Sequence, residues 1–288
     1  MKKLQRNLLL GAALLLTVGG AGHYALSATS EPAAEEPAVT AATELPLDAY
    51  RLSPDAEADY DHAGNLLIRT CMEDAGFTWY VPAEPAAGSV RNVRRYGVIE
   101  LAVAQRYGYH APPDERSEKV GRMRDRTMED PDAAEAFLGP EGNGGKGCSA
   151  KAGQRLGRGA GPADYGLLAG LDWRSLDLSE KHPEVRATWR DWQTCMRSQG
   201  YRYTSPRSAL ADRKWSGDDS AVSDTERAVA VADVVCKSEV GLVETWTRVE
   251  RRIQHELIAQ HPELERLRQV NEVLDKNARA VLKELQFP

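Results

Sequence analysis

The sequence lacks most of the short patterns that identify catalytic sites. It contains no Cys-x-x-Cys, no Gly-x-Ser-x-Gly and no Ser-x-x-Lys, which mark dithiol redox centres and serine acyl-enzymes. A phosphate loop ending at Lys146 fails twice, because Pro140 and Gly147 stand where Gly and Ser or Thr are needed. His255 and His261 lie six residues apart, whereas a zinc-protease helix places its two His four apart. We therefore predict no catalytic residue, no cofactor and no metal site.

The chain also has no excess of basic residues. It carries 37 Lys and Arg against 43 Asp and Glu, a formal charge of −6, which argues against nucleic acid as a partner. The many acidic residues leave one enzymatic alternative open, a cell-envelope hydrolase that uses paired carboxylates in a cleft between two halves of the chain. No spacing singles out such a pair, so the sequence favours a non-enzymatic protein.

The first 27 residues have the three parts of an export signal. Lys2, Lys3 and Arg6 precede an apolar run, and Ala25 and Ser27 fit the small positions before a cut after Ser27. If the segment is not cut, it stays as an anchor and is the only membrane contact that we predict. In either case the protein is extracytoplasmic, secreted or attached to the outer face of the cell membrane. Residues 28–54 are rich in Pro, Glu and Ala, which predicts a disordered tether.

A short internal repeat organises the rest of the chain. Residues 70–82 align without a gap with residues 194–206, and five of the 13 positions are identical. In both copies we expect the glycine, Gly76 or Gly200, to end a helix in the left-handed conformation. The aromatic residue that follows would then pack on the Met four positions before the glycine. We predict two related halves, 55–160 and 178–288, joined by a linker at 161–177.

The chain has four cysteines, too few for a disulfide-dense scaffold but an even number that can pair after export. One cysteine of each half belongs to the repeated segment. The repeat therefore favours pairing within each half, Cys71 with Cys148 and Cys195 with Cys236.

Three stretches of sequence resemble a known group of proteins. These are the repeated Cys-Met-x-x-x-Gly-[Phe/Tyr], the Arg-Tyr-Gly-Tyr-His of residues 106–110, and residues 230–237. They are similar to uncharacterised exported proteins and lipoproteins of high-GC Gram-positive bacteria, over most of residues 55–288. The resemblance implies the location and the pairing of the cysteines, and no reaction. The chain differs from the lipoprotein members because it lacks a lipobox cysteine.

The fold class is predicted to be all-α, because alternating β-branched runs are scarce and no Asn-Gly or Asp-Gly turn joins such runs. The C-terminal region predicts a long antiparallel helical hairpin with a coiled-coil-like seam. Its first helix runs from Ser223 or Asp224 to about Gln260, His261 and Pro262 break the chain, and a second helix follows.

Aromatic residues concentrate after residue 160, where five of the six Trp lie, four of them in the second half and Trp173 in the predicted linker. Core packing is the first interpretation of Trp189 and Trp192. The alternative is a surface that binds an envelope protein or a cell-wall polymer. That surface would consist of Trp189, Trp192, Leu242, Trp246 and Ile253. The predicted function is a non-enzymatic binding or accessory module of the cell envelope, with the hydrolase as the alternative.

Overall fold

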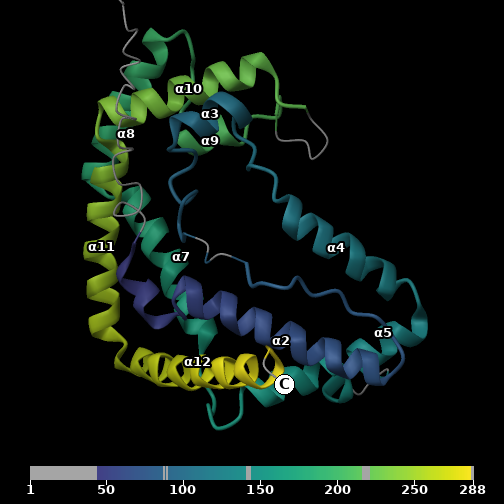
Figure 1. Ribbon diagram of the computed structural model, residues 1–288. Helices are drawn as coiled ribbons and strands as arrows, with labels where there is room; N and C mark the ends of the chain where they lie inside the picture. Colours follow the sequence, from purple (N-terminus) through teal and green to yellow (C-terminus); the bar gives the residue numbers. More distant parts are fainter. Residues whose placement is uncertain (1–43, 87, 89, 141–143, 216–220, 287–288) are drawn as a thin grey trace, which may run out of the picture. The chain divides into compact units, whose positions relative to one another are not determined.

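The computed structural model of the chain describes residues 44–86, 88, 90–140, 144–215 and 221–286, and every regular element in this part is helical (Figure 1). The 3-10 helices are η1 (Pro46–Tyr50), η2 (Gly144–Lys146) and η3 (Pro262–Leu264). The α-helices are α2 (Pro54–Asp74), α3 (Leu101–Tyr107), α4 (Glu115–Met128), α5 (Pro131–Leu138), α6 (Cys148–Leu156), α7 (Tyr165–Lys181), α8 (Pro183–Ser198), α9 (Pro206–Leu210), α10 (Asp224–Glu239), α11 (Leu242–Gln260) and α12 (Glu265–Gln286). The all-α prediction is confirmed.

The predicted export signal, and the tether up to residue 43, lie outside the described residues. Within the described part, no helix has both the length and the apolar character that crossing a membrane requires.

Helix α2 is the centre of the first disulfide-linked group of helices. The Ser53 side chain caps its first turn by accepting the Ala56 N–H, and Pro54 stands at the first helical position. Along its length α2 packs against α6 and α12 (Figure 1). Ala63 and three apolar residues of the other two helices fill the space between them: Leu156, Ala278 and Val281. The Cys71–Cys148 disulfide fastens α2 to α6.

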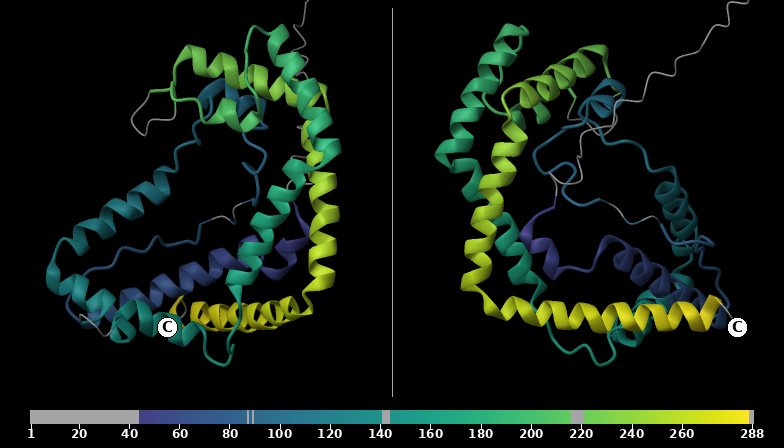
Figure 2. Two further views of the ribbon diagram at one scale, coloured as in Figure 1. Left: turned by 180° about the vertical axis from the view of Figure 1, so that it is seen from behind. Right: turned by 60° about the vertical axis from the view of Figure 1, so that its left-hand side comes forward.

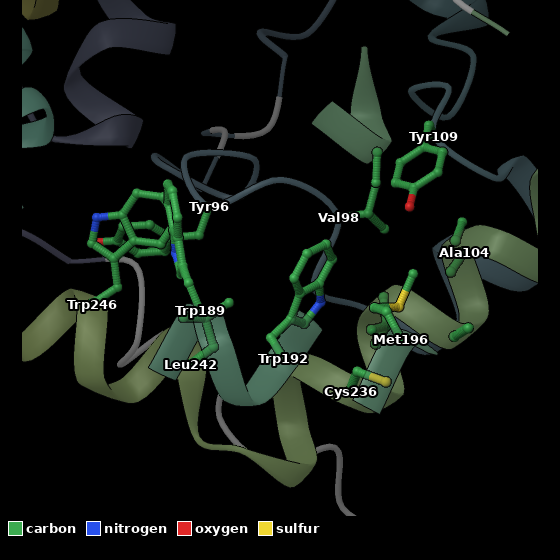
Figure 3. Packing of buried hydrophobic residues seen from close by; sticks show 14 of the residues in the cluster. Tyr96, Val98, Ala104, Tyr109, Trp189, Trp192, Met196, Cys236, Leu242 and Trp246 are labelled. Atoms are coloured by element: carbon green, nitrogen blue, oxygen red, sulfur yellow. The ribbon is translucent and has the colours of Figure 1, made fainter. Parts of the chain in front are cut away.

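A second group of helices surrounds the Cys195–Cys236 disulfide, which joins α8 to α10. Helices α3 and α9 pack on α10, and α11 packs on α8. The largest apolar cluster of the described residues lies here (Figure 3). Its aromatic members include Tyr96, Trp189 and Trp246. The centre of the Trp246 ring lies 5.0 Å from that of Tyr96 and 5.3 Å from that of Trp189. Helix α11 then continues from this group toward the first one and packs along α7.

The repeated motif forms the predicted helix ends. Gly76 and Gly200 both have φ of +89°. The N–H of Phe77 donates to the Met72 carbonyl at 2.8 Å, and the N–H of Tyr201 donates to the Met196 carbonyl at 2.9 Å. These are the six-to-one bonds of a Schellman cap. The predicted disulfide pairing is also confirmed, with a Cα–Cα distance of 5.6 Å in each bridge.

The antiparallel hairpin is wrong. The predicted first helix is two helices, because Gly241 takes the left-handed conformation at φ +62° and separates α10 from α11. Helix α11 packs along α7 and α8, whereas α12 turns away after η3 and packs along α2 (Figure 2). The apolar stripe of α12 therefore has a different partner from the one predicted. Apolar side chains at spacings of four and three residues, as at Leu274, Ala278 and Val281, identify a buried face of α12, but the spacing does not say which helix covers that face.

The predicted domain boundaries also need correction. Helix α3 of the first predicted half packs on α10 of the second, and α12 of the second packs on α2 of the first. Residues 161–177 form most of α7, with Leu168 and Leu171 buried, and so are not a linker. The tether ends earlier than residue 54, because Leu45 and Leu47 are buried and the Leu47 N–H donates to Gln254. Two buried leucines provide the apolar area that the Pro- and Glu-rich stretch before them lacks.

Candidate functional site

The residues predicted as a partner surface lie in the core instead. Trp189, Trp192, Leu242 and Trp246 are each at most 5% exposed, and Ile253 is half-buried against the same cluster (Figure 3). The first interpretation of the tryptophans, core packing, is correct. These side chains interlock α8 with α11 and the segment around Tyr96, so none of them is presented to a partner.

Buried charges make a second core feature, on α10. Lys237 donates from Nζ to Asp233 Oδ2 and to the Val98 carbonyl, both at 2.9 Å, and Asp233 Oδ1 accepts the Trp192 indole N–H at 2.9 Å. Burial raises the pKa of Asp233, against the opposing effect of Lys237. Burial, helped by Asp233, likewise raises the pKa of Tyr109. The whole group is enclosed, so its role is structural.

Two copies of the tripeptide Arg-Tyr-Gly fit around these charges. Each glycine has a positive φ, +83° at Gly97 and +57° at Gly108. A Cβ on Gly97 would lie 3.0 Å from Lys237 Nζ, and one on Gly108 would lie 2.4 Å from Glu226 Oε1. Glu226 Oε1 accepts the Tyr109 N–H at 2.8 Å. The glycines therefore let the backbone beside α3 approach the charged side chains of α10.

A third buried polar group joins the segment around Tyr96 to α7 and α11. The Arg95 guanidinium forms ion pairs with Asp172 and Glu250, and Tyr96 Oη donates to Glu250 at 2.9 Å. Ser175 Oγ donates to the same Glu250 at 2.8 Å. Glu250 is fully buried with all these donors, so we assign this cluster to the fold as well.

An open groove lies between α2, the extended segment 81–86 and α4. Its volume is about 350 Å³, and polar side chains from two walls converge on it. Helix α2 contributes Asp61, His62 and Asn65, and α4 contributes Arg116 and Arg124. The Asn65 Oδ1 accepts the Trp79 indole N–H at 3.4 Å, which fixes the amide at the groove. We take this groove as the candidate functional site.

His62 lines this groove from the α2 side. Only 6% of the residue is exposed, and its Nε2 has no hydrogen-bond partner among the described residues. Burial is the main cause that lowers the pKa of His62, and Arg116 and Arg69 lower it further. The imidazole is therefore neutral at physiological pH, with one polar nitrogen left unsatisfied.

Arg124 on the opposite wall is a half-buried cation without a carboxylate partner. Its Nε donates to the Tyr80 carbonyl at 3.3 Å, and its guanidinium carbon lies 5.0 Å from the centre of the Trp79 ring. No Asp or Glu oxygen among the described residues forms an ion pair with it. Burial lowers the pKa of Arg124, and no carboxylate of the described residues offsets that effect. Arg116, at the rim, donates to the Glu84 carbonyl and likewise has no ion pair in the described part of the chain.

Asp61 is the groove's own carboxylate. Its pKa is raised by the partial burial of the carboxyl group and then by Glu57. The hydrolase alternative needs two carboxyl groups held close together. Here the second carboxylate of the lining, Glu84, is exposed on another wall. The groove thus combines Asp61 with a histidine and two arginines, which suits binding better than paired-carboxylate hydrolysis.

One further cluster brings potential metal ligands together, at the second disulfide. Ligand atoms of Cys195, Cys236 and Glu239 lie within 4.8 Å of one another. Both sulfurs are bonded to each other, so neither is a thiolate that could bind a metal.

Comparison with protein-family models, curated proteins and solved structures gives no match for the chain. The groove therefore has to be interpreted from its own geometry. The groove was not predicted from the sequence, because residues 115–128 were not predicted to form a helix. The available indication was the run of basic residues in α4: Arg116, Lys119, Arg122, Arg124 and Arg126.

Proposed function

We propose that the protein is an extracytoplasmic binding module that holds an anionic group, a carboxylate or a phosphate, in the groove between α2 and α4. The single observation that carries the proposal is the Arg124 guanidinium. It is half-buried on the groove wall, uses one of its five donors on a backbone carbonyl and has no carboxylate partner in the described residues. A bound anion would supply the missing charge through a bidentate pair.

The attachment of α4 supports this proposal. None of its 14 residues is buried. The helix is capped by Asp114, and side-chain donors of the helix reach backbone carbonyls of residues 78–84, which hold it to that part of the chain. These include Thr127 to Thr78 at 3.0 Å and Arg124 to Tyr80 at 3.3 Å. An isolated helix of this length is only marginally stable in water, so a ligand that contacts both α2 and α4 would stabilise it substantially.

The two disulfides support the location. Both bridges are formed and all four cysteines are used, which is typical of proteins that fold in an oxidising compartment outside the cytoplasm. Cell-wall polymers that carry phosphate or carboxylate groups are accessible in that compartment. We infer that such a polymer is the ligand, with residues 1–27 directing the export of the chain.

The test is a titration of the oxidised protein with inorganic phosphate and with succinate, followed by NMR. The Arg124 side-chain Nε–H and the Trp79 indole N–H report on the groove directly, because both groups belong to its wall. A bound anion would partly neutralise Arg116, whose charge lowers the pKa of His62. We therefore expect the pKa of His62 to rise when the anion binds.

Two variants on the same helix make the test specific. Arg124→Gln removes a charge-assisted hydrogen bond worth about 1.5–3 kcal/mol, so the dissociation constant should rise by roughly ten- to 150-fold. Arg122→Gln is the matched control, because Arg122 is exposed and pairs with Glu118 instead of lining the groove. Equal loss of binding in both variants, or no effect of either anion on the pKa of His62, would refute the proposal. Tighter binding of phosphate would indicate a phosphate-bearing ligand, and tighter binding of succinate would indicate a carboxylate-bearing one.

A further inference from the structure

The two disulfides of the repeat have opposite chemical surroundings. The Cys71–Cys148 bridge borders an open pocket of about 730 Å³. A cation, Lys151 Nζ, lies 4.0 Å from the Cys71 sulfur. At the Cys195–Cys236 bridge the Cys195 sulfur lies 3.2 Å from Glu239 Oε2, an anion. A cation beside the attacked sulfur attracts an incoming thiolate and an anion repels it, so the two bridges should differ in their reactivity toward thiols.

The position of Cys148 on its helix adds to this difference. Cys148 is the first residue of α6, after Gly147 at the N-cap. The free N–H groups of a first helical turn stabilise a thiolate at that position. Cys236 lies inside α10, where the backbone N–H groups are already bonded within the helix. Cys148 is therefore the better leaving group of the two buried cysteines.

The pocket beside Cys71 carries charges of both signs. Lys146 and Lys151 supply the positive charge, and Asp74, Asp132 and Glu135 supply the negative charge. Cys71 is half-buried at its edge, while Cys148 is only 2% exposed. An incoming thiol therefore reaches the Cys71 sulfur first. A thiol that bears both an ammonium and a carboxylate group matches the mixed charges of the lining.

We propose that Cys71–Cys148 is a thiol-exchange site for a zwitterionic low-molecular-weight thiol, whereas Cys195–Cys236 is purely structural. The thiolate of the small molecule attacks the Cys71 sulfur. A new S–S bond forms between them, the Cys71–Cys148 bond breaks, and Cys148 leaves as a thiolate. A second small thiol can attack the mixed disulfide, which releases the oxidised dimer of the small molecule and leaves Cys71 reduced. Two thiols are oxidised and one protein disulfide is reduced, so the electrons balance.

The experiment treats the full oxidised chain, without denaturant and without oxygen, with L-cysteine, followed by alkylation and peptide mapping by mass spectrometry. We expect cysteine attached to Cys71, the alkylating group on Cys148, and an intact Cys195–Cys236 bridge. Circular dichroism on the same sample checks that the protein stays folded. Equal or faster opening of Cys195–Cys236, or cysteine attached to Cys148, would overturn the proposal.

Two comparisons test the roles of the charges. Lys151→Gln should slow the exchange by roughly fivefold or more, the effect of one charge at about 4 Å in a high dielectric. Lys181→Gln is the control, because Lys181 is an exposed lysine of α7 that pairs with Asp177. Cysteamine and mercaptopropionate carry only one of the two charges of cysteine and should react more slowly than cysteine relative to their thiolate concentrations. Equal rates for all three thiols, or an equal effect of both lysine substitutions, would contradict the proposed recognition.

Discussion

Replacing Lys237 by Met would remove the only cation of the described residues that forms an ion pair with the buried Asp233. Asp233 is fully buried, and Lys237 is 2% exposed. Without Lys237 the carboxyl must either stay charged in the core or take up a proton. Protonating a carboxyl whose ordinary pKa is about 3.9 costs about 4 kcal/mol at pH 7. This cost is the upper limit of the stability lost through the unpaired carboxyl. Losing the donor to the Val98 carbonyl adds on the order of 1 kcal/mol. We expect Lys237→Met to lower the free energy of unfolding by about 3–5 kcal/mol at pH 7.

The pH dependence of this loss tests its physical cause. Loss of Lys237 raises the pKa of Asp233 further in the folded state. The folded variant therefore carries a proton on Asp233 at pH values where the unfolded chain does not, since the unfolded carboxyl is protonated only near about pH 4. Its stability therefore rises as the pH falls, and the cost of protonation shrinks to about 1.5 kcal/mol at pH 5. Urea unfolding at pH 5 and pH 7, with both disulfides intact, measures the difference.

Two further variants define the control and the refutation. Lys181→Met breaks an ion pair with the same four-residue spacing, Asp177 to Lys181, but on the surface, and should cost less than about 0.5 kcal/mol. Asp233→Asn combined with Lys237→Met removes both charges and keeps an oxygen to accept the Trp192 N–H. This double variant should regain most of the stability that Lys237→Met loses. A double variant no more stable than Lys237→Met, or a loss that does not change with pH, would refute the reasoning.

The remaining predictions concern single positions. Gly108→Ala should destabilise the protein by about 3 kcal/mol or more in thermal unfolding, because the new Cβ would lie 2.4 Å from Glu226 Oε1 and φ is +57°. Gly153→Ala in α6, where a Cβ meets no atom of the described residues within 4 Å, should instead stabilise it by about 0.5–1 kcal/mol. Because the pKa of His62 is lowered, stability should fall by up to about 1.4 kcal/mol per unit as the pH drops below about 6.5. His62→Gln should remove that slope, and an unchanged slope would contradict the assignment.

Local features of the fold could be predicted from the sequence because a few residues determine each of them. The repeated Met and Gly of each motif specify a Schellman cap, and the positive φ of Gly76 and Gly200 agrees with it. The cysteine pairs followed from the same repeat. Helix partners could not be predicted in this way. The apolar stripe that includes Ala278 and Val281 fits any complementary apolar face, and only the complete three-dimensional arrangement selects α2.

The candidate site was missed for a different reason. A groove between helices leaves no recognisable pattern of residue spacing in the sequence. His62 and Arg124 lie 62 positions apart and come together only in the folded structure. Apolar periodicity also gives little indication of α4, since the helix is mostly charged, has few apolar residues and buries none of them. The predicted partner surface consisted of three tryptophans with Leu242 and Ile253, and large apolar side chains of this kind are the ones that a core buries first.

The repeat also explains why the two halves of the sequence do not fold as separate units. Each copy supplies one helix that a disulfide joins to a second helix, α2 with α6 and α8 with α10. A two-helix unit of this size cannot bury enough apolar area by itself. Each unit is completed by a helix from the other half of the chain, α12 beside α2 and α3 beside α10. Each half therefore contributes one helix to the core of the other. If either disulfide-linked pair of helices unfolds, apolar faces of both halves become exposed.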